Sequence, residues 1–263
     1  MSNELILTDI TPKGIAKVTL NRPDKHNAFD DAMIGELRDQ FRALAANDAV
    51  RVVILASSGK NFSAGADLNW MKRMAEYDFD DNLKDARALA DMLRALYEIP
   101  QPTIARVQGA AYGGAVGLVS CCDMAVASEE ASFCLSEVKI GLIPATISPY
   151  VIRAMGERQA RRYFTTAERI DAPTARDIGL VHEVTDADKL DQKLAELVGK
   201  LVLNGPKALR ESKSLVSDFA GRVISAGVIA DSCERIARIR VSEEGQEGLS
   251  AFLEKRDANW IVD

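Results

Sequence analysis

The stretch VQGAAYGGAVGL at residues 107–118 decides how the chain is classified. It starts at the end of a short apolar segment, TIARV at 103–107, and runs through glycines and other small residues into an apolar run. This order predicts a strand, a tight turn and a helix. The stretch NFSAGADLNWM at 61–71 has the same design after the apolar segment VRVVILA at 50–56. Both turns are expected to leave backbone N–H groups pointing outward beside a helix start.

Strand-like and helix-like segments alternate around these two turns. Short apolar runs or alternating apolar and polar residues predict strands at 15–20, 50–56, 103–107, 124–127 and 132–137. Apolar residues at helical spacing predict helices at 30–46, with Asp30 or Asp31 as its cap, and at 81–97. Further helices are expected at 147–155, 157–164, 174–178, 186–203, 206–219, 223–241 and 243–254. The pattern predicts an α/β domain followed by helices that pack on it or on a neighbour.

The composition is that of a globular protein. The 263 residues are 47% apolar and include 33 Lys plus Arg and 39 Asp plus Glu, which gives a net charge of −6. This length fits one large domain, or one domain with a small appendage. The acidic balance and the lack of a basic cluster argue against nucleic acid as a partner. No apolar run reaches roughly 18 residues and the N-terminus does not resemble a signal peptide, so a cytoplasmic protein without a membrane span is expected.

Cysteine and histidine are too few and too scattered to predict a disulfide framework or a metal site. The four cysteines form no C-x-x-C pair and are expected to be reduced core residues: Cys121, Cys122, Cys134 and Cys233. The chain has only two histidines, so no metal is expected. The sequence also lacks a nucleotide P-loop, a G-x-G-x-x-G turn and a nucleophile elbow.

The glycine-rich turns and one acidic residue are the places where chemistry is expected. Two turns that meet could present two N–H donors to one oxygen atom, which is the outline of an oxyanion hole. The alternative is that the glycines only allow tight turns and close packing. Glu137, in LSEVKIGLIP at 135–144, lies between an apolar segment and a Gly/Pro turn, so its carboxyl could be desolvated and act as an acid or base. The alternative for Glu137 is a solvated surface acid.

Five segments together resemble the crotonase, or enoyl-CoA hydratase/isomerase, superfamily. They are NRPDKHNAF at 21–29, FSAGADL at 62–68, QGAAYGGAVGLVSCCD at 108–123, SEVKIGLIP at 136–144 and EGLSAFLEKRDANW at 247–260. The resemblance implies an α/β fold of the crotonase type, a spiral of repeated β-β-α units followed by a C-terminal helical trimerisation region. It implies a spiral core over residues 1–200, a helical region over 201–263, and a homo-trimer or hexamer.

The resemblance also implies the roles of individual residues. By motif match, Ala64 and Gly114 donate backbone N–H groups to the carbonyl oxygen of an acyl-CoA thioester, and Glu137 is the catalytic acid and base. The coenzyme A moiety belongs to the substrate, and no other cofactor is implied. The residues that match CoA-binding positions are Lys25, Ala28, Ala66, Asp67, Leu68, Gly113, Phe252 and Lys255.

One position departs from the family pattern. A second catalytic glutamate would be expected three residues after Gly114, where this chain has Gly117. A single glutamate can still serve a hydratase, because one water can supply both the hydroxyl and the proton on the same face. It is also sufficient for an isomerase, which only moves a proton between two carbons. Four residues of the segment at 140–153 could line a polar acyl pocket, or else cap and cover a helix: Thr146, Ser148, Tyr150 and Arg153.

The function predicted from the resemblance is hydration of α,β-unsaturated acyl-CoA thioesters. The segment at 140–153 looks more like bacterial methylglutaconyl-CoA hydratases of leucine or terpene breakdown than like general fatty-acyl hydratases. The first alternative is an isomerase that shifts a β,γ double bond to the α,β position. Another is a CoA-ester or RNA-binding protein with little catalysis, and a third is a thioester hydrolase. The acyl chain, the direction of flux and the choice between trimer and hexamer stay open.

Overall fold

The computed structural model describes residues 4–261, and its main feature is a six-stranded sheet. The strand order is β1-β2-β3-β4-β6-β9. Only β1 and β2 pair antiparallel, and the other neighbours run parallel. The hairpin therefore forms one edge of a parallel sheet. The strands are β1 (Ile6–Ile10), β2 (Ile15–Leu20), β3 (Val52–Ser57), β4 (Thr103–Val107), β6 (Met124–Ser128) and β9 (Glu183–Thr185).

A smaller sheet is built from the chain directly after β4 and β6. It contains β5 (Ala110–Tyr112), β7 (Ser132–Cys134) and β8 (Ile170–Asp171). Two strands followed by helix therefore recur along the chain. The order is β1-β2-α1, then β4-β5-α4, then β6-β7 followed by α5. The three helices are α1 (Asp31–Ala45), α4 (Gly114–Cys121) and α5 (Ser148–Met155).

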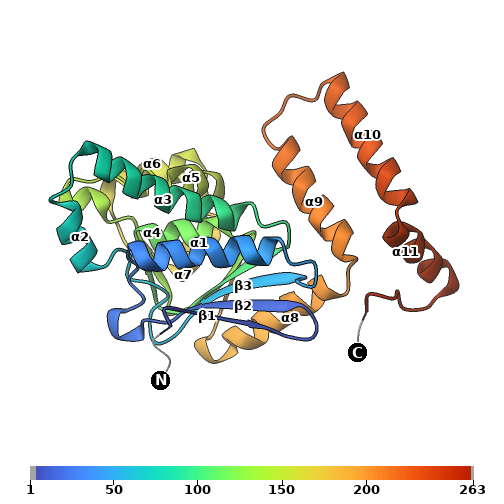
Figure 1. The fold of residues 1–263 in the computed structure, drawn as a ribbon, viewed down its shortest axis with the longest axis horizontal. Helices are drawn as coiled ribbons and strands as arrows, with labels where there is room; N and C mark the ends of the chain where they lie inside the picture. Colours follow the sequence, from blue (N-terminus) through green and yellow to red (C-terminus); the bar gives the residue numbers. More distant parts are fainter. Residues whose placement is uncertain (1–3, 262–263) are drawn as a thin grey trace.

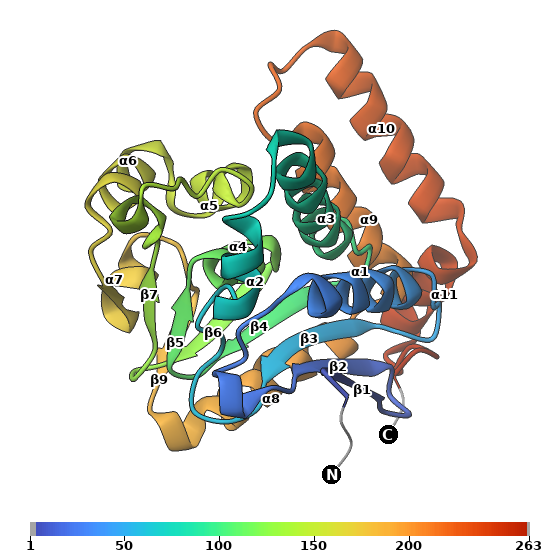
Figure 2. The ribbon, with the colours of Figure 1, turned by 60° about the vertical axis from the view of Figure 1, so that its left-hand side comes forward.

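The six-stranded sheet is covered on both faces. Helices α1, α3 (Phe79–Tyr97) and α4 lie over one face, and α8 (Leu190–Val202) lies under the other (Figures 1 and 2). Strand β3 is buried along its whole length, as a central strand between two helical layers must be. Val53 and Leu55 belong to the main core, while Val52 and Ile54 belong to the core shared with α8. This double burial explains the continuous apolar run of β3.

The last three helices project from the sheet as an arm (Figure 1). They are α9 (Pro206–Phe219), α10 (Ala226–Val241) and α11 (Glu243–Glu254). Polar contacts tie the arm to the core: Arg51 donates to the carbonyl oxygens of Asn204 and Trp260 at 2.8 and 2.9 Å. Lys213 pairs with Asp123 at 2.6 Å. Neither α9 nor α10 contains a buried residue, so this chain covers their apolar side chains only in part.

The remaining short elements connect these layers. They are α2 (Leu68–Met74), α6 (Glu157–Thr166), α7 (Ala172–Asp177), η1 (Pro23–Lys25), η2 (Glu137–Ile140) and η3 (Ala187–Lys189), where η marks a 3-10 helix. Within residues 4–261, no helix has the length and apolar character needed to cross a bilayer. The same residues contain no group of three or more side chains arranged to hold a metal ion.

Helix α4 is a core helix that needs glycine in its middle. A Cβ atom at Gly117 would lie 2.3 Å from Cγ2 and 2.8 Å from Cβ of Ile147. It would also lie 3.5 Å from Cδ2 of Leu93. No side chain fits at position 117 unless Ile147 moves, because protein cores are close-packed. Gly117 therefore lets α4 lie directly against the start of α5 and against α3.

The sequence predicted most of the long elements. The strand at 15–20 and the helices at 206–219 and 243–254 have the predicted bounds, and Asp30 caps α1 by accepting a hydrogen bond from the N–H of Met33 at 3.0 Å. The predicted strand at 132–137 ends at Cys134, because η2 begins at Glu137.

Cys233 is exposed on α10 and is not a core residue, whereas the other three cysteines are buried. The helix expected after the turn at 61–71 is α2, whereas the sequence did not predict β1, β5, β8 or β9. The predicted boundary after residue 200 remains a prediction, and α8 ends at Val202.

We expect Gly117→Ala to lower the free energy of unfolding by about 1–3 kcal/mol, because the added methyl group must displace Ile147. The matched control is Gly199→Ala in α8, where a Cβ meets nothing within 4 Å. That change should be neutral or stabilise by about 0.5–1 kcal/mol, since alanine favours a helix interior. Urea unfolding of both variants measures the difference. A Gly117→Ala protein as stable as the Gly199→Ala protein would contradict this packing argument.

Candidate active site

A cavity of about 250 Å³ lies where the two glycine-rich turns meet the segment after β7. Helices α2 and α3 form one wall, with Trp70, Met74, Asn82, Asp85, Ala86 and Leu89. Residues 142–147 form the opposite wall. The base is made of Phe29, Ala66, Gly114 and Glu137. Three of the four come from the segments that the sequence analysis singled out for chemistry.

The loop at 26–29 is fixed by one buried asparagine and one arginine. Asn27 has a left-handed backbone with φ 53° and is completely buried. Its side-chain amide donates to the carbonyl oxygens of Ser58 and Asn61, at 2.7 and 2.9 Å. Arg22 donates to the carbonyl oxygen of Ala28 at 3.0 Å and pairs with Asp67 at 3.2 Å. These bonds hold the loop against the start of α2.

Residues 63–66 lie between this loop and β5 and bend at Gly65. On one side, Ser63 accepts a hydrogen bond from the N–H of Tyr112 at 3.0 Å and donates to Ala110 at 3.0 Å. On the other side, Phe29 is bracketed by a bond from its N–H to Gly65 and a bond from Asp67 to its carbonyl.

This bracketing turns the N–H of Ala66 away from Phe29. In a parallel bridge, the bonded groups are those of the residues before and after the bridging residue. The N–H of Ala66 therefore points to the side of β5 and the start of α4. It makes no hydrogen bond within residues 4–261.

The structure corrects the prediction for Ala64. Its N–H donates to the carbonyl oxygen of His26 at 2.9 Å, so it is not free to bind a substrate oxygen. Gly65, with φ +95°, lies between Ala64 and Ala66 and reverses the direction of the backbone. The unpaired donor of this turn belongs to Ala66, which was predicted only as a CoA contact.

Gly114 provides the second unpaired N–H. It is the first residue of α4, so its N–H has no acceptor within the helix, and no bond to another group is found between residues 4 and 261. The helix start adds partial positive charge there. A Cβ at Gly114 would lie 2.6 Å from Cζ of Phe29, so only glycine fits beside that ring. Gly113 has φ 54°, and its own N–H donates to Cys134 at 2.8 Å.

Glu137 brings a carboxyl group to the same place. It is the first residue of η2, and its Oε1 would lie 3.4 Å from a Cβ built on Gly113. Its Oε2 is buried and has no hydrogen-bond partner in the described part of the chain. Burial raises the pKa of Glu137 above its usual value. A buried carboxyl oxygen without a partner beside two free N–H donors is a typical arrangement for acid–base chemistry on a carbonyl compound.

The predicted CoA residues near the two turns divide into exposed and buried groups. Lys25 and Leu68 are exposed, at η1 and at the start of α2, whereas Ala28 is buried. Burial raises the pKa of Asp67, but hydrogen bonds from the N–H groups of Asn69 and Trp70 and the nearby Arg22 lower it below its usual value overall. The Asp67 carboxylate therefore caps α2 and holds the 26–29 loop, while its backbone N–H donates to Phe29 and its carbonyl accepts from Met71.

Phe252 and Lys255 lie outside the cavity of their own chain. Phe252 is 81% exposed near the end of α11, and Lys255 follows with a left-handed backbone of φ 56°. No residue of α9, α10 or α11 in the described chain lines the cavity. Figure 2 shows α11 at the opposite end of the sheet from α5 and α6. These two helices follow η2, the 3-10 helix that contains Glu137. The predicted contact of Phe252 and Lys255 with CoA is therefore not made at the cavity of their own chain and remains a prediction.

Helix α3 contributes residues that the sequence analysis did not single out. Asp85 and Asn82 face the cavity on the same side of α3 as Leu89 and the buried Leu93. The signal was available, because Asp85 continues the apolar stripe of α3 by one helical turn. An acid on a core-facing stripe has to be explained by a partner or by function.

Only one of the four residues proposed for a polar acyl pocket lines the cavity. That residue is Thr146. Ser148 donates its hydroxyl to the carbonyl oxygen of Ala145 at 2.8 Å, and Arg153 donates to the hydroxyl of Tyr97 at 2.9 Å. Tyr150 packs its ring against Tyr97 with centroids 5.2 Å apart. Tyr150 and Arg153 therefore support the packing of α5 on α3, and Ser148 holds the turn that begins α5.

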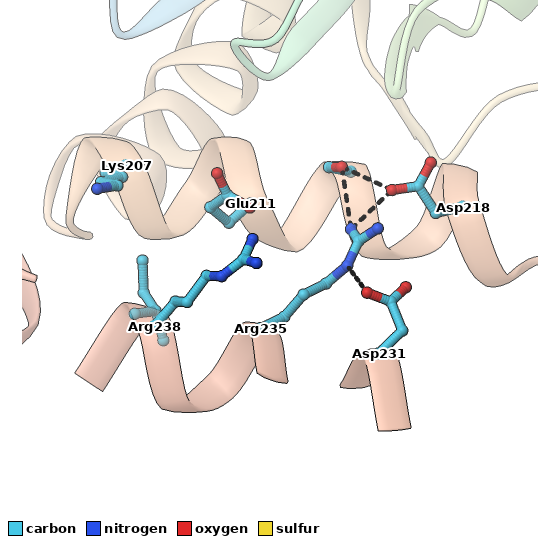
Figure 3. A pocket seen from close by; sticks show the side chains of 8 residues that line it. Lys207, Glu211, Asp218, Asp231, Arg235 and Arg238 are labelled. Carbon is cyan, nitrogen blue, oxygen red and sulfur yellow. Dashed lines mark hydrogen bonds and ion pairs between the residues drawn. The ribbon is translucent and has the colours of Figure 1, made fainter. Parts of the chain in front are cut away.

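A second pocket, of about 380 Å³, lies between α9 and α10 and offers no comparable chemistry. Three of its charged groups, Arg235, Asp218 and Asp231, pair with one another, as Figure 3 shows. Arg235 bridges Asp218 at 2.6 Å and Asp231 at 3.2 Å. These ion pairs hold the two helices of the arm together.

Comparisons with known proteins agree with this geometry. The sequence profile of the enoyl-CoA hydratase/isomerase family matches residues 11–262. An enoyl-CoA hydratase structure from Shewanella pealeana is 49% identical, with 98% of this chain and 96% of that chain covered and a TM-score of 0.94. A Legionella pneumophila protein assigned to the enoyl-CoA hydratase/isomerase (crotonase) class is 43% identical over 99% of this chain and 100% of that chain, also with a TM-score of 0.94. The 2,3-dehydroadipyl-CoA hydratase of Escherichia coli is 32% identical, covering 91% of this chain and 92% of that protein.

Proposed function

Because this chain belongs to the enoyl-CoA hydratase/isomerase family, we propose that it adds water to the double bond of α,β-unsaturated acyl-CoA thioesters. Its predicted crotonase-type fold is confirmed by its structural relatives. One observation carries the proposal: Glu137, which has a buried carboxyl oxygen without a partner, lines the same cavity as Ala66 and Gly114, whose N–H groups make no bond within residues 4–261.

The two N–H groups would bind the thioester carbonyl oxygen. Attack at the β-carbon moves electron density onto this oxygen, so donors placed there stabilise the transition state more than the ground state. Removal of one such donor costs roughly 3–4 kcal/mol in other enzymes. Ala66 therefore takes the role that the sequence analysis gave to Ala64.

Glu137 would move the proton. As the water oxygen bonds to the β-carbon, the ionised carboxyl takes one proton from that water. It then gives this proton to the α-carbon of the enolate, on the same face. Water is consumed, one C–O and one C–H bond form, and the double bond is lost. The reaction is balanced without an electron carrier.

An isomerase remains the second candidate, and the packing around Gly117 favours it. Ile147 fills the space where the family pattern has a second glutamate. Glu137 is therefore the one carboxyl that the motif segments supply to the cavity. Moving a double bond from β,γ to α,β needs only one proton-transferring group. The two reactions share the same oxygen-binding groups and differ in whether water is added.

A branched substrate with a terminal carboxylate, such as methylglutaconyl-CoA, is the finer form of this proposal. The compound named for the Escherichia coli relative, 2,3-dehydroadipyl-CoA, is an enoyl-CoA of this carboxylated kind. The cavity lining given by residues 4–261 contains Asp85 and Glu137 but no Lys or Arg. A cation for a terminal carboxylate would therefore have to come from another subunit.

We further propose a trimer, or a pair of trimers, built through the arm. The supporting observation is that α9 and α10 bury none of their residues in this chain, while apolar side chains along the arm are exposed. Ile224, Phe252 and Leu253 are 82%, 81% and 78% exposed. Patches of this kind mark interaction surfaces. A neighbouring chain would then bring Phe252 and Lys255 to the CoA.

Glu137→Gln should lower kcat for hydration by about 10²- to 10⁴-fold, because the amide keeps the shape but cannot exchange a proton. The Kd for the acyl-CoA should change little. Mass spectrometry of crotonyl-CoA, methylglutaconyl-CoA and a β,γ-enoyl-CoA measures both gain of water and isomerisation. Glu130→Gln, an exposed glutamate, is the matched control. Wild-type rates in the Glu137→Gln protein would refute the mechanism.

The pH profile of kcat/KM should have its acid limb above the ordinary glutamate pKa of 4.5. Burial raises the pKa of Glu137, so the carboxyl keeps its proton to a higher pH and the ionised base is lost earlier on acidification. Crotonyl-pantetheine is the preferred substrate, since it lacks the titrating nucleotide of CoA. An acid limb at or below 4.5 would contradict the assignment of Glu137 as the base.

Light scattering after gel filtration should give three or six times the chain mass of 28.6 kDa. The double variant Ile224→Asp with Ile229→Asp should shift the protein toward the monomer, because it places charge on an apolar contact surface. Ile10→Asp on β1, also at an exposed isoleucine, is the control and should not change the mass. A wild-type monomer would contradict the proposed assembly.

A further inference from the structure

Hydration needs a group that holds the attacking water. Apart from Glu137, the motif segments supply no carboxyl group to the cavity for this purpose. In the family pattern, a second glutamate would come from position 117. In this chain Gly117 faces Ile147, whose Cγ2 lies 2.3 Å from where a Cβ would be. Glu137 alone would have to orient the water and also transfer its proton. A second carboxyl group from elsewhere in the cavity would divide this work.

Helix α3 supplies such a group at Asp85. It lines the same cavity of about 250 Å³ as Glu137, on the wall formed by α2 and α3. The indole N–H of Trp70 donates to its Oδ1 at 3.2 Å, which fixes the orientation of the carboxyl. Trp70 is itself only 3% exposed and therefore a firm support. The Oδ2 of Asp85 makes no hydrogen bond to any residue in 4–261, so it is free to bind a molecule in the cavity.

The charges around Asp85 favour its use as a hydrogen-bond acceptor. Burial raises its pKa, and the nearby negative charge of Asp31 raises it further. The hydrogen bond from Trp70 and the positive charge of Arg73 act in the opposite direction. Arg73 also forms an ion pair with Asp31 at 2.5 Å, so the positive charge of Arg73 is shared between Asp31 and Asp85. A carboxylate with a raised pKa binds the proton of a water molecule more strongly than an ordinary one.

The other polar group of this wall is less suited to the task. The side-chain amide nitrogen of Asn82 donates to the carbonyl oxygens of Tyr77 and Asp78, at 3.2 and 2.9 Å. These two bonds occupy the amide nitrogen of Asn82 in holding the turn that leads into α3. A neutral amide oxygen is also a weaker acceptor than a carboxylate.

We propose that Asp85 binds the water molecule that adds to the β-carbon and presents it to the substrate in the cavity that it shares with Glu137. This inference rests on the proposed hydratase activity. Asp85 accepts one O–H of the water and stays ionised. The other O–H bond breaks, its proton passes to Glu137 and then to the α-carbon, and the oxygen bonds to the β-carbon. Asp85 replaces, from α3, the acid that Gly117 cannot provide.

The experiment compares two reactions of the same site in the same variant. The first is addition of water to crotonyl-CoA. The second is exchange of the α-protons of butyryl-CoA for deuterium in D₂O, which needs the oxygen-binding N–H groups and Glu137 but no added water. Both are followed by mass spectrometry. Asp91→Asn is the matched control for Asp85→Asn, because Asp91 is an exposed aspartate of α3 outside the cavity lining.

We expect Asp85→Asn to lower kcat/KM for hydration by about 100-fold and to leave α-proton exchange within about threefold of wild type. Asp91→Asn should change neither. Hydration by Asp85→Asn at the wild-type rate would overturn the role of Asp85 and leave the hydratase proposal intact. An equal loss of hydration and exchange would also overturn it, because Asp85 would then act on the whole site. A wild-type protein that exchanges protons but adds no water would refute the hydratase proposal itself.

Discussion

The parallel hydrogen bonds that hold residues 63–66 between Phe29 and β5 are the interaction on which the rest of the site depends. They use the backbone of Ser63 on one side and the backbone around Ala66 on the other. The N–H of Ala66 is left free because its neighbours in the chain make the bonds. Gly114 completes the pair because β5, which carries the chain to α4, is bonded to the same segment. A backbone donor placed in this way needs no particular side chain, only the absence of one that would block the approach.

How far the sequence predicts this site depends on the physical nature of each part. Glu137 and Gly114, which the family resemblance singled out, both line one cavity, and their catalytic roles remain predictions. The sequence could not show that the free N–H belongs to Ala66 and not to Ala64. In a regular strand, residues 64 and 66 would point to the same side. The positive φ of Gly65 breaks this rule, so that Ala64 faces His26 and Ala66 faces the cavity.

The helices show the same difference between local and tertiary information. The period of apolar residues predicted α3, and its continuation leads to Asp85, but nothing local says that Glu137 shares its cavity. The short elements β5, β8 and β9 were missed because each has only two or three residues and is defined by its pairing partner. The burial of Gly117 against Ile147 likewise depends on two segments that are distant in the sequence.

For the arm, even the tertiary contacts of this chain leave apolar side chains exposed. Its polar attachments to the core include Arg51 and Lys213, while α9 and α10 bury none of their residues in this chain. A helix keeps exposed isoleucine and phenylalanine side chains in water only at a cost, which burial against another chain removes. The same arm carries Phe252 and Lys255, which the cavity of its own chain does not receive. In the proposed assembly, one surface would therefore serve both stability and substrate binding, because the contact that covers the apolar faces is also the one that brings two residues to the neighbouring CoA.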